Sequence, residues 1–200
     1  MAVLVLQNFM ESRILLSGAE LNLFTILNPT PLSAQEVASR IGADLRALTV
    51  LLDALSAMGL LVKKSETYQC ANSVSPFLSE DAPNSVLPMV LHADHLWQRW
   101  SGLKDVVRST IVSKGAVKSS RSPEELRAFI GAMHIIAAPR ADEIVAATNP
   151  DSSKTLLDVG GASGTYTIAF LKAVPEMKAT LFDKPEVVDM ARERLNKAGM

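Results

Sequence analysis

The sequence contains little of several residue types, and each scarcity excludes a class of site. Cys70 is the only cysteine among 200 residues, which excludes a disulfide within the chain and metal sites built on cysteine pairs. With a net charge of −1, binding to nucleic acid would need a local basic patch. No apolar run reaches the ~18 residues of a membrane span, and the first residues include no basic leader. We therefore expect a cytoplasmic protein with no metal site and no contact with a membrane.

Apolar residues are dense over residues 3–27, which we predict to form two helices broken near Ser17 and Gly18. A helix that is apolar on more than one face needs a packing partner on each of those faces. The sequence leaves open whether that partner is the same domain or a second subunit.

A winged helix is predicted next. A capping-box pattern that begins at Ser33 opens a short helix, and a second helix with apolar residues at helical spacing follows over residues 45–58. Two short strands, over residues 60–62 and 67–70, complete the order helix, turn, helix and wing. Read alone, this half of the chain indicates a DNA-binding module.

The middle of the chain is predicted to be helical. One long stretch runs from residue 86 to about 112 with a break at Gly102, and a second helix covers residues 122–148. Pro139 kinks or restarts that second helix. The turn-rich residues 149–153 then mark a domain boundary.

Beyond this boundary, short apolar strands alternate with helices. We predict a buried strand over residues 155–159, a second strand over residues 178–182, and helices over residues 163–174 and 185–198. This alternation implies a parallel sheet with right-handed crossovers. Two strands cannot bury both faces of a sheet, so we expect the chain to be cut short at Met200 or completed by other structure.

The turn after the first of these strands carries the residues most indicative of function. Four of them are predicted to bind a cofactor: Asp158, Gly160, Gly161 and Gly164. Glycine lets the backbone approach a ligand, and it leaves amide groups free at a helix start. A dinucleotide fingerprint would need glycine at two positions where Ala162 and Thr165 stand. An acid beside the turn suits a cationic ligand better than a pyrophosphate, which favours S-adenosylmethionine with its sulfonium and ammonium groups.

Asp183 stands at the end of the second strand. A carboxylate there can accept hydrogen bonds from both ribose hydroxyls of an adenosine, and Lys184 would follow along the adenine side. The alternative is that Asp183 only caps the next helix. The glycine turn upstream favours the ribose role.

The chain resembles a known family in four segments above all: residues 33–38, 46–55, 157–164 and 180–188. The family is that of the S-adenosylmethionine-dependent O-methyltransferases of the plant caffeate type, with their bacterial natural-product and hydroxyneurosporene-type relatives. The family usually has a third glycine where this chain has Ala162, and often leucine in place of Lys184.

The resemblance implies an α/β fold with an all-α N-terminal region. A winged-helix dimerisation domain would occupy residues 1–112, and linker helices lining the substrate pocket would occupy residues 113–150. Residues 151–200 would form the first β-α-β-α part of a Rossmann-like class I methyltransferase domain, truncated at residue 200.

The resemblance also implies a homodimer formed through the N-terminal helices, and a substrate pocket lined by Phe129, Met133 and Trp97. Packing within the core is the alternative for these three side chains. The family's catalytic histidine is expected beyond residue 200, so this chain alone would be inactive. No catalytic residue is assigned among the three histidines of the chain, which are His92, His95 and His134.

The function implied is methyl transfer from S-adenosylmethionine to a hydroxyl of a small aromatic or polyketide-like molecule, without a nucleic-acid partner. One alternative is a winged-helix transcription regulator, although its second helix offers only Arg46 and its wing only Lys63 and Lys64. Another is a nicotinamide-dependent oxidoreductase, against which Ala162 and Thr165 stand. A family member that uses the cofactor for another purpose stays possible.

Overall fold

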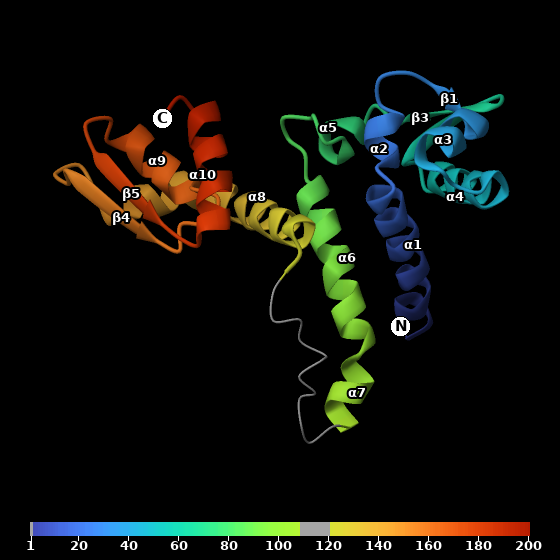
Figure 1. Ribbon diagram of the computed structural model, residues 1–200, viewed down its shortest axis with the longest axis horizontal. Coiled ribbons are helices and arrows are strands. Elements are labelled where there is room, and N and C mark those ends of the chain that lie inside the picture. The colour runs from blue at the N-terminus through green and yellow to red at the C-terminus, as the bar shows by residue number, and fades with distance from the viewer. Residues whose placement is uncertain (1, 109–120) are drawn as a thin grey trace. The chain divides into compact units, whose positions relative to one another are not determined.

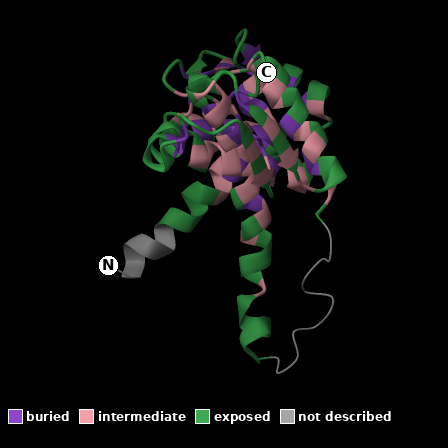
Figure 2. Cartoon of the chain, turned by 90° about the vertical axis from the view of Figure 1, so that its left-hand side faces the viewer, coloured by how far each residue is buried: buried purple, intermediate pink, exposed green. Residues whose placement is uncertain are grey.

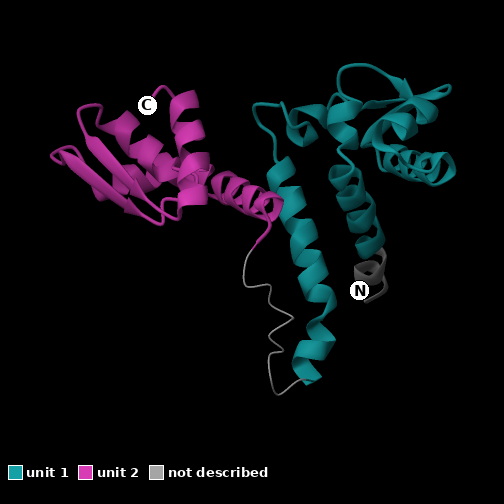
Figure 3. Ribbon diagram, in the orientation of Figure 1, with its two compact units in different colours: residues 1–108 teal, residues 109–200 magenta. Residues whose placement is uncertain are grey.

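A computed structural model describes residues 2–108 and 121–200. The chain divides into two compact units, residues 1–108 and 109–200 (Figure 3). The second unit includes the helix α8 (Pro123–Thr148), which the sequence assigned to a separate linker. The three-part division of the chain stays a prediction.

The first unit is mostly helical (Figure 1). Its helices are α1 (Ala2–Glu20), α2 (Leu23–Ile26), α3 (Ala34–Ile41), α4 (Leu45–Ala57), α5 (Ser75–Leu78), α6 (Leu87–Ser101) and α7 (Leu103–Arg108). Its strands β1 (Leu32–Ser33), β2 (Leu61–Lys64) and β3 (Thr67–Cys70) form an antiparallel sheet in the order β1-β3-β2. The predicted order of helix, turn, helix and hairpin is therefore present. The sequence did not predict β1, because two residues are too short for a hydrophobic period.

The predicted break near Ser17 and Gly18 is wrong. α1 continues through Gly18, and the chain turns at Asn22, whose φ of 54° lies in the left-handed region. A Cβ on Gly18 would lie 3.1 Å from Leu55 and 3.3 Å from Phe24. The glycine therefore permits close packing within the core, where the sequence interpretation made it a helix break.

The core of the first unit joins α1 and α2 to the sheet and to α4. Its largest fully buried side chains include Leu23, Phe24, Leu52, Leu55 and Tyr68. The unit leaves much apolar surface uncovered, because α7 is exposed along its length (Figure 2) and Phe9 on α1 is 50% exposed.

The second unit contains a parallel pair of strands and helices. Its elements are α8, β4 (Thr155–Val159), α9 (Thr165–Ala173), β5 (Lys178–Phe182) and α10 (Pro185–Lys197). β4 and β5 pair in parallel with Leu157 opposite Thr180, and both have the predicted bounds. α8 begins with a capping box, in which the Ser122 hydroxyl accepts from the Glu125 amide, and continues past Pro139 to Thr148.

The prediction that β4 is buried is wrong for one face of this sheet. Leu157, Val159 and Phe182 are between 64% and 69% exposed. The alternate residues, such as Leu156 and Leu181, are half-buried on the face that contacts α9. The strand period of two therefore places one set of apolar side chains on a face that no residue between 121 and 200 covers. Among the described residues, no helix has the length and apolar character needed to span a membrane.

Candidate functional site

The turn between β4 and α9 has an unusual backbone. Gly160 and Gly164 both have φ of 73°, and Gly164 forms the N-cap of α9. Ala162 also lies in the left-handed region, with φ of 47°. A residue with a Cβ is disfavoured there by about 1–2 kcal/mol, so surrounding contacts must hold the turn in this shape.

Gly161 is required by a close approach to its neighbours. A Cβ at this position would lie 2.6 Å from Leu181 Cγ and 3.0 Å from Asp158 Cγ. At Gly160, by contrast, an added Cβ would meet no atom within 4 Å. The turn is thus packed against β5 on one side and open on the other.

Asp183 is joined to this turn by a hydrogen bond. Its Oδ2 accepts from the Ala162 amide over 2.9 Å, and its Oδ1 accepts from the Lys184 amide over 2.8 Å. The Gly160 amide also donates to the Phe182 carbonyl over 2.7 Å. Lys184 is the N-cap of α10, so Asp183 does not accept from the first-turn amides that a helix cap would satisfy.

Asp158 supplies the second carboxylate of the site, beside that of Asp183. Its Oδ2 accepts from the Thr167 hydroxyl over 2.6 Å, which fixes the carboxylate against the first turn of α9. A carboxylate oxygen can accept two hydrogen bonds, so Asp158 and Asp183 both retain acceptor capacity. Two half-buried carboxylates beside an open turn can accept from hydroxyls and attract a cation, and they repel a pyrophosphate.

α8 brings His134 to the same turn. Its Nδ1 lies 2.7 Å from the Thr165 hydroxyl, which lies 2.7 Å from the Ser163 hydroxyl. Burial, with a smaller effect from the charge of Arg194, lowers the pKa of His134 to about 4, so the imidazole is neutral near pH 7. The sequence interpretation used Thr165 only as a missing glycine, and it gave the hydroxyls of Ser163 and Thr167 no role.

The residues predicted to line the substrate pocket are divided between the two units. Phe129 and Met133 are half-buried on α8, and the Arg121 guanidinium lies 4.0 Å from the centre of the Phe129 ring. Trp97 lies on α6 in the first unit, where it stacks on Phe9 with ring centres 6.5 Å apart. That these three side chains share one pocket stays a prediction.

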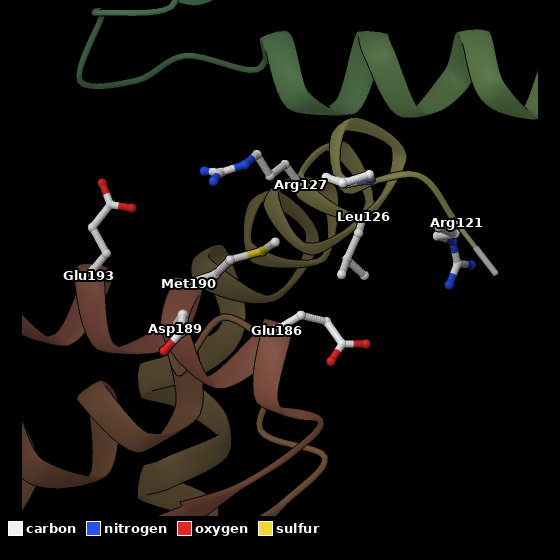
Figure 4. A pocket seen from close by; sticks show the side chains of 8 residues that line it. Arg121, Leu126, Arg127, Glu186, Asp189, Met190 and Glu193 are labelled. Carbon is white, nitrogen blue, oxygen red and sulfur yellow. The ribbon is translucent and has the colours of Figure 1, made fainter.

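Each unit has a pocket of its own. In the first unit, a largely apolar pocket of about 470 Å³ is lined by Ser12, Leu15, Leu16, Met89, Val90, Ala93, Trp97 and Trp100. In the second unit, a pocket of about 390 Å³ lies between the start of α8 and α10 (Figure 4) and is lined by Arg121, Pro123, Leu126, Arg127, Glu186, Asp189, Met190 and Glu193. Two acids of the latter already form ion pairs within α10, which are Asp189 with Arg192 and Glu193 with Lys197. Its mixed charges indicate no particular ligand.

Lys63 of the wing forms an ion pair within the first unit. Lys63 Nζ lies 2.7 Å from Asp53 Oδ1, and the Tyr68 hydroxyl donates to the same oxygen over 2.7 Å. These contacts raise the pKa of Lys63, whose ammonium group is paired with the Asp53 carboxylate. The basic footprint available to a DNA phosphate is therefore smaller than the sequence suggested.

Comparison with known proteins gives consistent matches along the chain. The family model described as an O-methyltransferase dimerisation domain matches residues 3–79, and that of an O-methyltransferase domain matches residues 100–200. The tetracenomycin polyketide synthesis 8-O-methyl transferase TcmO of Streptomyces glaucescens is 32% identical, over 94% of this chain and 57% of its own length.

Two solved structures resemble the chain. Human N-acetylserotonin methyltransferase in complex with SAM has 25% identity and a TM-score of 0.75, covering 96% of this chain and 62% of its own. PigF with SAH has 24% identity and a TM-score of 0.82, covering 99% of this chain and 62% of its own, and this likeness concerns the fold alone. The chain spans less than two thirds of the length of TcmO and of either structure.

Proposed function

The chain belongs to the family of O-methyltransferases that have an N-terminal dimerisation domain, and on this basis we propose that it binds S-adenosylmethionine and takes part in methyl transfer to a hydroxyl. Family membership and the predicted fold class, a dimerisation domain followed by a methyltransferase domain, are confirmed. The observation that carries the proposed function is the hydrogen bond from the Ala162 amide to Asp183, which joins an acid and a glycine-rich turn at one edge of a parallel sheet.

The chemistry of the residues at this edge suits the cofactor. Asp183 retains acceptor capacity for the ribose hydroxyls, and Asp158 supplies negative charge for a sulfonium or ammonium group. The open side of the turn at Gly160 leaves room for a ligand against the backbone. Gly161 and Gly164 maintain the turn, and Lys184 follows Asp183 as the N-cap of α10. When bound, S-adenosylmethionine supplies an electrophilic methyl group.

The acceptor is proposed to be a small aromatic or polyketide-like molecule. The relative TcmO is named for its part in tetracenomycin polyketide synthesis. Phe129, Met133 and Trp97 would offer apolar contacts to such a molecule. No residue of the described part of the chain is assigned the removal of the acceptor's proton.

The first unit is proposed to be a winged helix that serves dimerisation. The match to the dimerisation domain over residues 3–79 supports this role, as does the apolar surface left exposed on α1 and α7. The pairing of Lys63 with Asp53 counts against a DNA-binding role. The cytoplasmic location stays a prediction.

Calorimetric titration of the full-length protein tests the proposed function. We expect saturable binding of S-adenosylmethionine and no binding of NADH, because the acidic turn repels a pyrophosphate. Binding of NADH with no response to S-adenosylmethionine would favour the oxidoreductase alternative. Methyl transfer to nitrogen in place of oxygen in a product assay would correct the acceptor and leave the cofactor proposal standing.

A further inference from the structure

A chain of three polar side chains connects α8 to the turn after β4. The imidazole Nδ1 of His134 lies 2.7 Å from the Thr165 hydroxyl, and this hydroxyl lies 2.7 Å from the hydroxyl of Ser163. Ser163 is 4% exposed and Thr165 is 8% exposed. Water therefore has little access to the two hydroxyls, and His134 and the hydroxyls serve as partners for one another.

The Thr165 hydroxyl links the two contacts. It has one hydrogen and two acceptor sites, so it can donate to at most one of its two neighbours and can accept from the other. A neutral His134 fits either direction, whereas removal of its ring nitrogen leaves the buried Thr165 hydroxyl with one partner fewer. Arg194 of α10 is the charged group that lowers the pKa of His134, and its positive charge favours the neutral ring.

The two hydroxyls lie where the turn meets the first residue of α9. Ser163 is flanked by Ala162 and Gly164, which both have positive φ, and Thr165 begins α9. The Gly164 amide also donates to the Gly161 carbonyl over 2.8 Å. A side chain that fixes Ser163 and Thr165 therefore fixes the backbone between Gly160 and the start of α9.

We propose that His134 is a positioning residue for the cofactor turn, which it holds in its ligand-binding shape through Thr165 and Ser163. This inference rests on the proposed binding of S-adenosylmethionine. His134 acts through the turn and touches no reacting atom, which separates its role from that of a catalytic base. A turn already held in shape loses less conformational freedom on binding, so affinity for the cofactor depends on His134.

Calorimetry with S-adenosylhomocysteine on the full-length protein tests the proposal. We expect His134→Leu to weaken binding about tenfold, because a buried hydroxyl loses its partner and the turn gains alternative conformations. Thr165→Val should weaken binding by a similar factor, and the double variant should be no weaker than either single variant, because both changes break the same chain. His134→Asn should restore affinity to within about threefold, since its amide can replace the Nδ1 hydrogen bond. Arg140→Gln, an exposed change on α8, is the matched control.

Ring-nitrogen NMR of His134 without ligand supplies a readout independent of affinity. We expect one fixed tautomer in the wild type, and a mixture of tautomers in Thr165→Val, because the hydroxyl then no longer selects between them. Tight binding by His134→Leu, or additive losses in the double variant, would overturn the inference. If the wild type itself does not bind S-adenosylhomocysteine, the proposed function fails instead.

Discussion

The backbone amide of Ala162 donates a hydrogen bond to the carboxylate of Asp183 over 2.9 Å, which ties the turn after β4 to the end of β5. The same carboxylate accepts from the Lys184 amide. Asp183 therefore both organises the turn and retains the capacity to accept from a ligand. Because Asp183 has both roles, we expect different substitutions of it to weaken ligand binding to different degrees.

Replacing Asp183 by Ala is expected to weaken S-adenosylmethionine binding by about 2–3 kcal/mol, because charge-assisted hydrogen bonds are lost. Asp183→Asn should lose less, since the amide oxygen can still accept from Ala162. Calorimetry of both variants checks this order, with Asp189→Asn on the exposed surface of α10 as the control. Equal affinity of Asp183→Ala and the wild type would refute the ribose role.

Ala162 is expected to respond to substitution according to its positive φ of 47°. Ala162→Gly should raise the free energy of unfolding by about 0.5 kcal/mol, because relief of the left-handed strain exceeds the added chain entropy. Ala162→Val should lower it by about 1–2 kcal/mol, because a branched Cβ fits this region less well. Urea denaturation measures both, and a stabilising effect of valine would show that the turn differs in solution.

Gly161 is expected to tolerate no Cβ unless Leu181 is made smaller. Gly161→Ala places a methyl 2.6 Å from Leu181 Cγ and should cost about 1–3 kcal/mol of stability through overpacking. Leu181→Ala also destabilises, by leaving a space behind. The double variant should be more stable than the sum of the two losses predicts, as a double-mutant cycle from urea denaturation would reveal. If the two losses of stability simply add in the double variant, the close contact between residues 161 and 181 would be contradicted.

His134 is expected to make stability depend on pH. Its folded-state pKa of about 4 lies below the ordinary value of 6.5, so the unfolded chain binds more protons between these values. The contribution of His134 to the free energy of unfolding is thus fully present above pH 6.5, and it declines as the pH falls toward 4. Because the ring is only half-buried, the loss should be about 1–2 kcal/mol. His134→Asn should lack this part of the decline, and parallel pH curves for wild type and variant would contradict the lowered pKa.

Much of the second unit was predictable from sequence because its signals are local. The strands over residues 155–159 and 178–182 were correctly bounded, since an apolar run ends in an acid and a glycine or proline follows. The sequence predicted that two strands cannot bury both faces of their sheet, but it did not predict that Leu157 and Phe182 lie on the uncovered face, because the coverage of a sheet depends on elements far along the chain.

The errors in the first unit have the same origin. Gly18 looked like a helix break because glycine has low helix propensity, but its small size is needed next to Leu55, 37 positions later in the sequence.

In the second unit, the contact between His134 and Thr165 also joins separate elements, and no periodicity signals it. Residue chemistry thus predicted the acids of the site, whereas the hydroxyls that support them emerged only from packing.

A crystal structure of the full-length protein with S-adenosylhomocysteine tests the central claim most directly. The account predicts that Asp183 accepts hydrogen bonds from the ribose hydroxyls and that the backbone between Gly160 and Gly164 lies against the ligand. A nucleoside bound elsewhere, or an Asp183 carboxylate that does not touch the ribose, would contradict it.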